Sequence, residues 1–301
     1  MNQGWRLGLL AASIFIGVLF PPIAALFKPY LMLLIFLLFL CAVLQVSFAE
    51  VTRVALRERV SWLALVWQLL VLPLILFVCL KPMLPDQLYI FAVVSMCTGA
   101  ITATTALCRI FNLNSALSLV VGMMGAVLMP VPLYLFLNVL SGMEVQLELS
   151  DYLVRIAIFI LLPILITFVL RRLLSVEQDA WLKEQMPGTV LILLVFFALA
   201  VMDGVGELLR SNPLLLLSYV VLAFGLSLGV QLLSYYTFLF FGRRDATTVA
   251  LLCAYRNMGT VAAIAGSSLG EQFFIFVGVW QLPMYLLPWL LRRQYQLRHS
   301  L

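Results

Sequence analysis

An arginine stands in the middle of an apolar stretch near the end of the chain, residues 251–270, LLCAYRNMGTVAAIAGSSLG. Arg256 keeps its proton in a protein, and a charge at the centre of a bilayer costs about 2.5 to 3.5 kcal/mol on insertion scales. Asn257, Gly259 and Thr260 follow it, and small or polar residues let a helix loosen and a solute approach the backbone. We interpret the stretch as half of a solute-binding site. The alternatives are a loop arginine or a packing salt bridge.

A second polar interruption lies near residue 100, where four threonines fall within eight residues, starting at Thr98. Where helices break inside a membrane, their N-terminal N–H groups favour anions. Hydroxyl and amide donors beside a permanent positive charge therefore predict a site for a small organic anion such as a carboxylate. The threonines could instead bond back to their own helix. The predicted substrate-binding residues are Thr102, Thr104, Thr105, Arg256, Asn257, Gly259 and Thr260.

The residues that most enzymes need are missing from the apolar segments. All thirteen acidic residues lie in loops or near segment ends, with Asp203 the nearest to an exception, and His299 is the only histidine. The five cysteines show no C-x-x-C spacing. We expect no enzymatic activity, no cofactor and no metal centre. A proton-coupled carrier generally needs a titratable group within the membrane, and only Asp203 could serve as one.

The composition requires a lipid environment. Of 301 residues, 64% are apolar and only 10% are charged, more apolar residues than a soluble core of this size could bury. Long apolar runs favour a helical bundle over a barrel, whose strands alternate. The bilayer is therefore the expected partner, and the net charge of +5 does not indicate nucleic-acid binding. The first apolar segment is too long for a signal peptide, so we expect an uncleaved helix.

The apolar runs predict ten membrane spans, and the loops between them differ in charge. Thirteen basic residues fall on one side of the membrane and four on the other. Because positive loops stay in the cytoplasm, we expect both termini to be cytoplasmic in a protein of the plasma (inner) membrane. The predicted spans are residues 7–26, 30–48, 60–80, 88–110, 116–140, 152–170, 187–206, 213–240, 247–267 and 271–291.

An acidic loop near residues 141–151 divides this single membrane domain, 1–301, into two groups of five spans. A duplicated unit with an odd number of spans must be inverted in the membrane, as in many secondary transporters. Gln68 and Gln231 mark spans 3 and 8, and glycine-rich polar interruptions mark spans 4 and 9. We therefore expect two inverted five-helix repeats, residues 1–141 and 150–293.

These features resemble the bile acid:sodium symporter family over nearly the whole chain. The resemblance is carried by Gln68 five residues before Pro73, by the segment NLNSALSLVVG after the threonine-rich break, and by Asn257. It implies an all-α fold with a panel domain of spans 1, 2, 6 and 7 and a core domain of spans 3–5 and 8–10. It also implies solute binding where broken helices 4 and 9 cross.

The resemblance implies sodium sites that this sequence preserves only in part. The matching ion-binding positions are Gln68, Thr104, Thr105 and Ser118. A further hydroxyl position holds Gly122, the glutamate position of helix 9 holds Leu252, and a glutamine position holds Arg256. Two sodium ions and a glutamate carry a charge of +1, and so does arginine with leucine. We hypothesise that Arg256 replaces the bound sodium.

Several other functions stay open at the level of sequence. The chain could be a sodium-coupled symporter of the same family, or a membrane sensor that binds a solute without moving it. Cys97 lies near the position of a cysteine in arsenite-type exporters of the same superfamily, although span 9 lacks their acidic signature. A ten-span metabolite exporter of unrelated fold is the last alternative.

Overall fold

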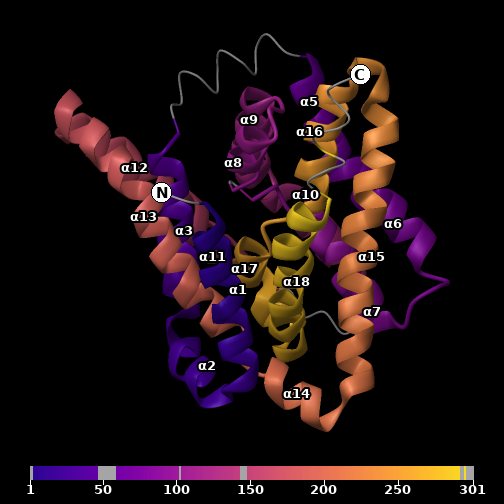
Figure 1. Cartoon of the computed structure of the whole chain (residues 1–301). Helices are drawn as coiled ribbons and strands as arrows, with labels where there is room; N and C mark the ends of the chain where they lie inside the picture. The colour runs from indigo at the N-terminus through magenta and orange to yellow at the C-terminus, as the bar shows by residue number, and fades with distance from the viewer. Residues whose placement is uncertain (1–2, 47–58, 102, 143–147, 292–294, 296–301) are drawn as a thin grey trace. The chain divides into compact units, whose positions relative to one another are not determined.

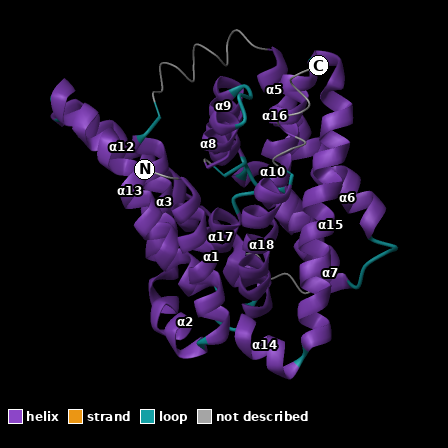
Figure 2. Ribbon diagram, in the orientation of Figure 1, coloured by secondary structure: helices purple, strands orange, loops and turns teal. Residues whose placement is uncertain are grey.

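The computed structural model describes residues 3–46, 59–101, 103–142, 148–291 and 295, and the named secondary-structure elements among these residues are all helices, joined by loops and turns (Figure 2). An all-helical membrane fold was expected because a helix satisfies its own backbone hydrogen bonds in lipid. The α-helices in chain order are α1 (Gln3–Leu19), α2 (Pro21–Phe27), α3 (Leu31–Leu44), α5 (Arg59–Val66), α6 (Leu72–Leu80), α7 (Asp86–Met96), α8 (Ala103–Ile110), α9 (Ser115–Leu128), α10 (Pro130–Leu140), α11 (Leu149–Ile156), α12 (Leu162–Leu173), α13 (Val176–Val201), α14 (Val205–Ser211), α15 (Pro213–Phe238), α16 (Arg243–Ala254), α17 (Met258–Leu269) and α18 (Glu271–Leu290).

Six described helices or continuous helical stretches are long and apolar enough to cross a membrane. A seventh candidate is the pair α9 and α10, which is bent by 48° at its break. These seven overlap seven of the ten predicted spans. The other three predictions fall on α1, which has 17 residues, and on the broken pairs α7–α8 and α16–α17. A total of ten spans stays a prediction.

The chain divides into two compact units that interleave in sequence. Unit 1 comprises Met1–Val46, Glu148–Tyr219 and Ala262–Gln281, and unit 2 comprises Ser47–Leu147, Val220–Val261 and Leu282–Leu301. Unit 1 thus contains α1 to α3 and α11 to α14, whereas unit 2 contains α5 to α10 and α16. That the two sequential halves, 1–141 and 150–293, are inverted five-helix repeats stays a prediction.

In unit 1, the long helix α13 packs against α1, α2 and α3 (Figure 1). It begins at Val176, eleven residues before the predicted start at 187. Ser175 and Gln178 form a reciprocal capping box that starts the helix in this polar stretch. Hydrophobicity alone missed this start because residues 176–186 are too polar to be read as a span.

The first predicted span, 7–26, is also wrong at its end. Helix α1 stops at Leu19, and α2 starts at Pro21. Phe20 between them has φ −120° and ψ 74°, outside the helical region. Proline disfavours helical geometry in the residue before it, so the Pro-Pro pair ends the first helix early.

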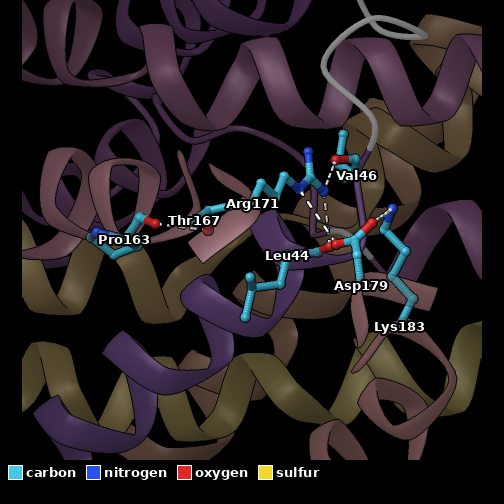
Figure 3. A network of polar contacts seen from close by, with 7 residues as sticks. All are labelled: Leu44, Val46, Pro163, Thr167, Arg171, Asp179 and Lys183. Carbon is cyan, nitrogen blue, oxygen red and sulfur yellow. Dashed lines mark hydrogen bonds and ion pairs between the residues drawn. The ribbon is translucent and has the colours of Figure 1, made fainter. Parts of the chain in front are cut away.

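Arg171 joins three segments of unit 1, as Figure 3 shows. Its Nη2 donates to the carbonyl oxygen of Leu44 at 3.0 Å and also to that of Val46. Its Nε lies 4.0 Å from Asp179 Oδ1, and Asp179 also pairs with Lys183. A guanidinium has several donors in one plane and can therefore satisfy carbonyls at the end of α3 while it pairs with α13.

Two π-helical segments, Trp67–Val71 in unit 2 and Ala157–Leu161 in unit 1, each lie just before a proline. Pro73 and Pro163 lack an N–H group, and their rings would clash with the carbonyl four residues earlier. The wider π turn accommodates the ring inside an otherwise continuous helix. In the first case the π turn also carries Gln68, which is buried.

In unit 2, α9 packs against α5, α8 and α16. Asn114 starts α9, since its Oδ1 accepts a hydrogen bond from Leu117 N at 3.0 Å. The same side chain donates to Asp245 Oδ1 at 2.9 Å, and its backbone N–H donates to Thr248 Oγ1 at 3.1 Å. These bonds fix the start of α9 against α16 and thereby place α9 beside the interrupted helices.

Candidate functional site

The two polar interruptions face each other within unit 2. Helix α7 ends at Met96 and α8 begins at Ala103, while α16 ends at Ala254 and α17 begins at Met258. Between these ends, Ala100 and Arg256 form an antiparallel β-bridge. Asn257 N donates to Gly99 O at 3.0 Å, and Ile101 N donates to Tyr255 O at 2.9 Å. Two non-helical segments can persist in a membrane fold because each satisfies backbone groups of the other.

Gly99 lets this paired segment lie directly on α9. A Cβ atom at this position would lie 2.6 Å from the carbonyl carbon of Gly125 and 2.7 Å from Ala126 N. Gly125 takes part in the same close approach, because its own Cβ would lie 3.3 Å from Gly99 Cα. Only glycine permits such contact between two backbones.

Arg256 is held at the paired break by main-chain carbonyl groups. Its Nη1 donates to Thr98 O at 2.8 Å and to Gln68 O at 3.3 Å. Gln68 Nε2 donates to the same Thr98 oxygen at 3.3 Å. Thr98 follows the C-terminal end of α7, where the helix dipole favours a positive charge. The guanidinium is thus oriented by the break itself.

The Arg256 side chain is 0% exposed, and no carboxylate among the described residues lies within ion-pair distance of it. Its Nε and Nη2 have no hydrogen-bond partner in the described parts of the chain. Among the described residues Arg256 thus makes no packing salt bridge, and it lies in a buried break between α16 and α17 rather than in an exposed loop. Burying an ion costs several kcal/mol unless charge or hydrogen bonds compensate it, and here two carbonyl groups do so only in part.

The other predicted residues of the ninth span lie at the start of α17. Asn257 Oδ1 accepts a hydrogen bond from Thr260 N at 3.3 Å and so caps this helix. Gly259 and Thr260 are buried in its first turn. These three residues lie directly after Arg256, which places them beside the break.

The predicted residues of the fourth and fifth spans, which lie in and before α8 and in α9, form a second group. Thr105 Oγ1 lies 3.3 Å from Ser118 Oγ, so the structure brings these two hydroxyls together. Thr104 is buried, and its hydroxyl has no partner in the described chain. No hydrogen bond between described residues joins Thr105 or Ser118 to Arg256. Thr102 lies outside the described residues.

Sequence reasoning missed the two carbonyl groups that hold Arg256, because a backbone oxygen leaves no signal in residue types. It also missed a cluster next to the break. The hydroxyl of Tyr255 lies 3.5 Å from that of Tyr295, which accepts a hydrogen bond from Gln231 Nε2. The Tyr295 ring also packs against Phe111 in a tilted arrangement, with ring centroids 5.0 Å apart. Gln231, the polar residue singled out in span 8, is thus connected to Tyr255 at the break through Tyr295.

Two further predictions concern Cys97 and Asp203. Cys97 is fully buried, and its Sγ bonds to Val93 O one turn earlier, which fits a packing role. In unit 1, Asp203 pairs with Lys28 at 2.8 Å. Asp203 and Lys28 line a cavity of about 480 Å³, together with Glu207 and Glu271. All four belong to unit 1, whereas the residues that hold Arg256 belong to unit 2.

The fold and the site define an integral membrane protein built of helices, with two paired interruptions around a buried charge. This arrangement is suited to binding a solute, because broken helices within a membrane bundle are tolerated where they line a site. The chain matches the model of the SBF-like CPA transporter family over residues 4–300, and it belongs to this family. Among curated proteins, no sequence matches it.

Proposed function

We propose that the protein is a secondary transporter that moves a small organic anion, a carboxylate or a bile-acid-like solute, by alternating access. The observation that carries this proposal is the buried guanidinium of Arg256, which has two unpartnered nitrogens and no carboxylate partner among described residues. The family of transporters to which the chain belongs supports the general activity. Family membership is also the reason to place transport ahead of an enzymatic role.

The proposal requires an anion because the buried charge needs a counter-charge. A negatively charged solute would pair with Arg256, and its own desolvation would be offset by the guanidinium. The N-terminal turn of α17 adds N–H groups next to the charge, since the helix begins two residues after Arg256. The proposed binding set is completed by Thr102, Thr104, Thr105, Asn257, Gly259 and Thr260.

We further propose that Arg256 takes the place of a bound sodium ion. Backbone carbonyl oxygens are good ligands for hard cations. Here two of them, from Thr98 and Gln68, already accept hydrogen bonds from the guanidinium. A permanent cation at that place removes the need for a free one, so transport should not require sodium.

The alternative within the family is sodium-coupled symport. It is favoured by the Thr105 and Ser118 hydroxyls, 3.3 Å apart, and by the unpartnered oxygens of Gln68 and Thr104. Oxygen atoms of this kind could hold a sodium ion. The third possibility, a sensor, would keep the binding site but would not exchange solute across the membrane.

The same proposal includes the membrane architecture. The two breaks occupy the fourth and ninth predicted spans, corresponding positions in two inverted repeats of five, which supports a ten-span carrier. The basic loops support cytoplasmic termini in a plasma (inner) membrane. Rocking of a core domain against a panel domain would then expose the site alternately.

The test is counterflow of radiolabelled carboxylates in proteoliposomes, with sodium or choline as the only external cation. We expect exchange in both media, loss of exchange in Arg256→Gln, and normal exchange in the matched variant Arg109→Gln, which changes an exposed arginine of the same unit. Binding without exchange would indicate a sensor. Exchange that disappears in choline would rule out the replacement of sodium by Arg256 and favour symport.

A further inference from the structure

The guanidinium of Arg256 has one tethered nitrogen and two that are free. Nη1 donates to the carbonyl oxygens of Thr98 and Gln68, whereas Nε and Nη2 have no partner within the described residues. The side chain is 0% exposed, so bulk solvent does not satisfy these N–H groups. Two of the five N–H groups of the guanidinium are therefore used by Nη1, and the three free ones lie on two adjacent nitrogens, Nε and Nη2.

Nε and Nη2 lie on one edge of the planar guanidinium, and each directs an N–H bond outward in a nearly parallel direction. Such an edge matches the two oxygens of one carboxylate, which it can bind through two parallel hydrogen bonds. The two carbonyl bonds on Nη1 hold the plane of the group. The free edge consequently has a fixed direction relative to the paired break.

We infer that this edge recognises a carboxylate group of the solute, with one oxygen on Nε and the other on Nη2. The inference rests on the proposed transport function and adds to it the chemistry of the solute's headgroup. A neutral amide lacks the charge that the buried guanidinium needs. A thiocyanate ion has the charge but presents a single terminal atom, so it cannot give each of the two parallel N–H bonds an acceptor atom of its own.

The test measures the binding of monocarboxylates from acetate to benzoate to the purified full-length protein, by shifts of the melting temperature. The corresponding amides and thiocyanate serve as comparison probes. In the native protein we expect carboxylates to bind better than thiocyanate, and amides to have no effect. Arg256→Lys keeps the charge and loses the fork, so it should weaken carboxylate binding by about tenfold or more and change thiocyanate binding by less than about threefold.

The outcomes separate this inference from the function on which it rests. If Arg256→Lys weakens the binding of carboxylates and thiocyanate equally, or leaves both intact, the two-point binding of a carboxylate by Nε and Nη2 is refuted, while an anion-binding site still stands. If the native protein binds no anion at all, the proposed function fails and the inference fails with it. Arg109→Lys is the matched control and should leave all of the binding curves unchanged.

A second measurement needs no folded variant at the site. In native protein labelled with ¹⁵N-arginine, a bound probe with a ¹³C-labelled carboxyl group, such as benzoate, lies close to the nitrogens that bind it. Dipolar coupling to this ¹³C nucleus should reduce the ¹⁵N solid-state NMR signals of one arginine. We expect the Nε and Nη2 signals of that arginine to be reduced and the Nη1 signal to be largely unaffected. Equal reduction of Nη1 and Nη2, with Nε unaffected, would show end-on binding and overturn the inference.

Discussion

Replacing Gly99 with alanine is the sharpest structural test of the paired break. The new Cβ would lie 2.6 Å from the carbonyl carbon of Gly125, whereas ordinary contacts begin at 3.4 Å, so the backbones must separate by roughly 0.8 Å. The clashing atoms belong to the main chain of α9 and cannot move aside as the end of a flexible side chain can. Inserting a methyl group in such a place typically costs about 1 to 3 kcal/mol.

The separation should also disturb the site. Gly99 O accepts the hydrogen bond from Asn257 N, and the neighbouring Thr98 O accepts the bond from Arg256. A shift of several tenths of an ångström therefore weakens the bonds that orient the guanidinium. We expect Gly99→Ala to lower the melting temperature by several degrees and to reduce solute exchange by more than the loss of folded protein explains.

Gly122→Ala is the matched control for this prediction. Gly122 lies within α9, and a Cβ atom there would meet nothing within 4 Å. Because alanine is the better helix former by about 1 kcal/mol, this variant should be as stable as the native protein or more stable. Both variants are purified in detergent, melted and assayed for exchange. If they melted and transported alike, the close approach between Gly99 and α9 would be refuted.

Three further predictions test other parts of the chain. Arg171→Ala removes charged hydrogen bonds to the end of α3 and should lower the free energy of unfolding by about 1.5 to 3 kcal/mol; an unchanged chemical denaturation curve would contradict this. Asp203→Asn breaks a pair with Lys28, whose side chain is 56% exposed, and should cost less than about 1 kcal/mol by the same measurement; a larger loss would show a hidden structural role. Leu252→Glu adds a carboxylate at a fully buried position and should not make exchange depend on sodium, because the guanidinium supplies the cation; sodium-dependent exchange in this variant would contradict the replacement hypothesis.

The outcome at α13 illustrates where hydropathy stops being informative. The apolar run beginning near residue 187 marks the membrane-embedded part, but the helix begins at Val176 because Ser175 and Gln178 cap it. The capping motif is visible in the sequence, but its polar residues leave no signal in an apolar pattern. The early end of α1 has a similarly local cause, the Pro-Pro pair after Phe20.

The site residues show a different limit. The positions of Arg256 and of both breaks follow from residue types, since a charge inside an apolar run is costly unless it serves a purpose and small or polar residues let a helix loosen. The family resemblance implied that Thr105 and Ser118 belong to one ion-binding set, which stays a prediction, and the structure brings their hydroxyls within 3.3 Å of each other. No hydrogen bond among the described residues connects that pair to Arg256, and spacing along the chain does not say which hydrogen bonds connect two groups.

The sequence by itself determined that the chain is a helical membrane protein and that its chief buried charge interrupts a span, because these conclusions depend only on composition and on the cost of a charge in lipid. Only the tertiary structure decided what holds that charge. The carbonyl oxygens of Thr98 and Gln68 come from segments far from Arg256 in sequence, and every residue carries the same carbonyl group. Which of them meets the guanidinium is a matter of how the two breaks pair, and pairing is a property of the folded chain.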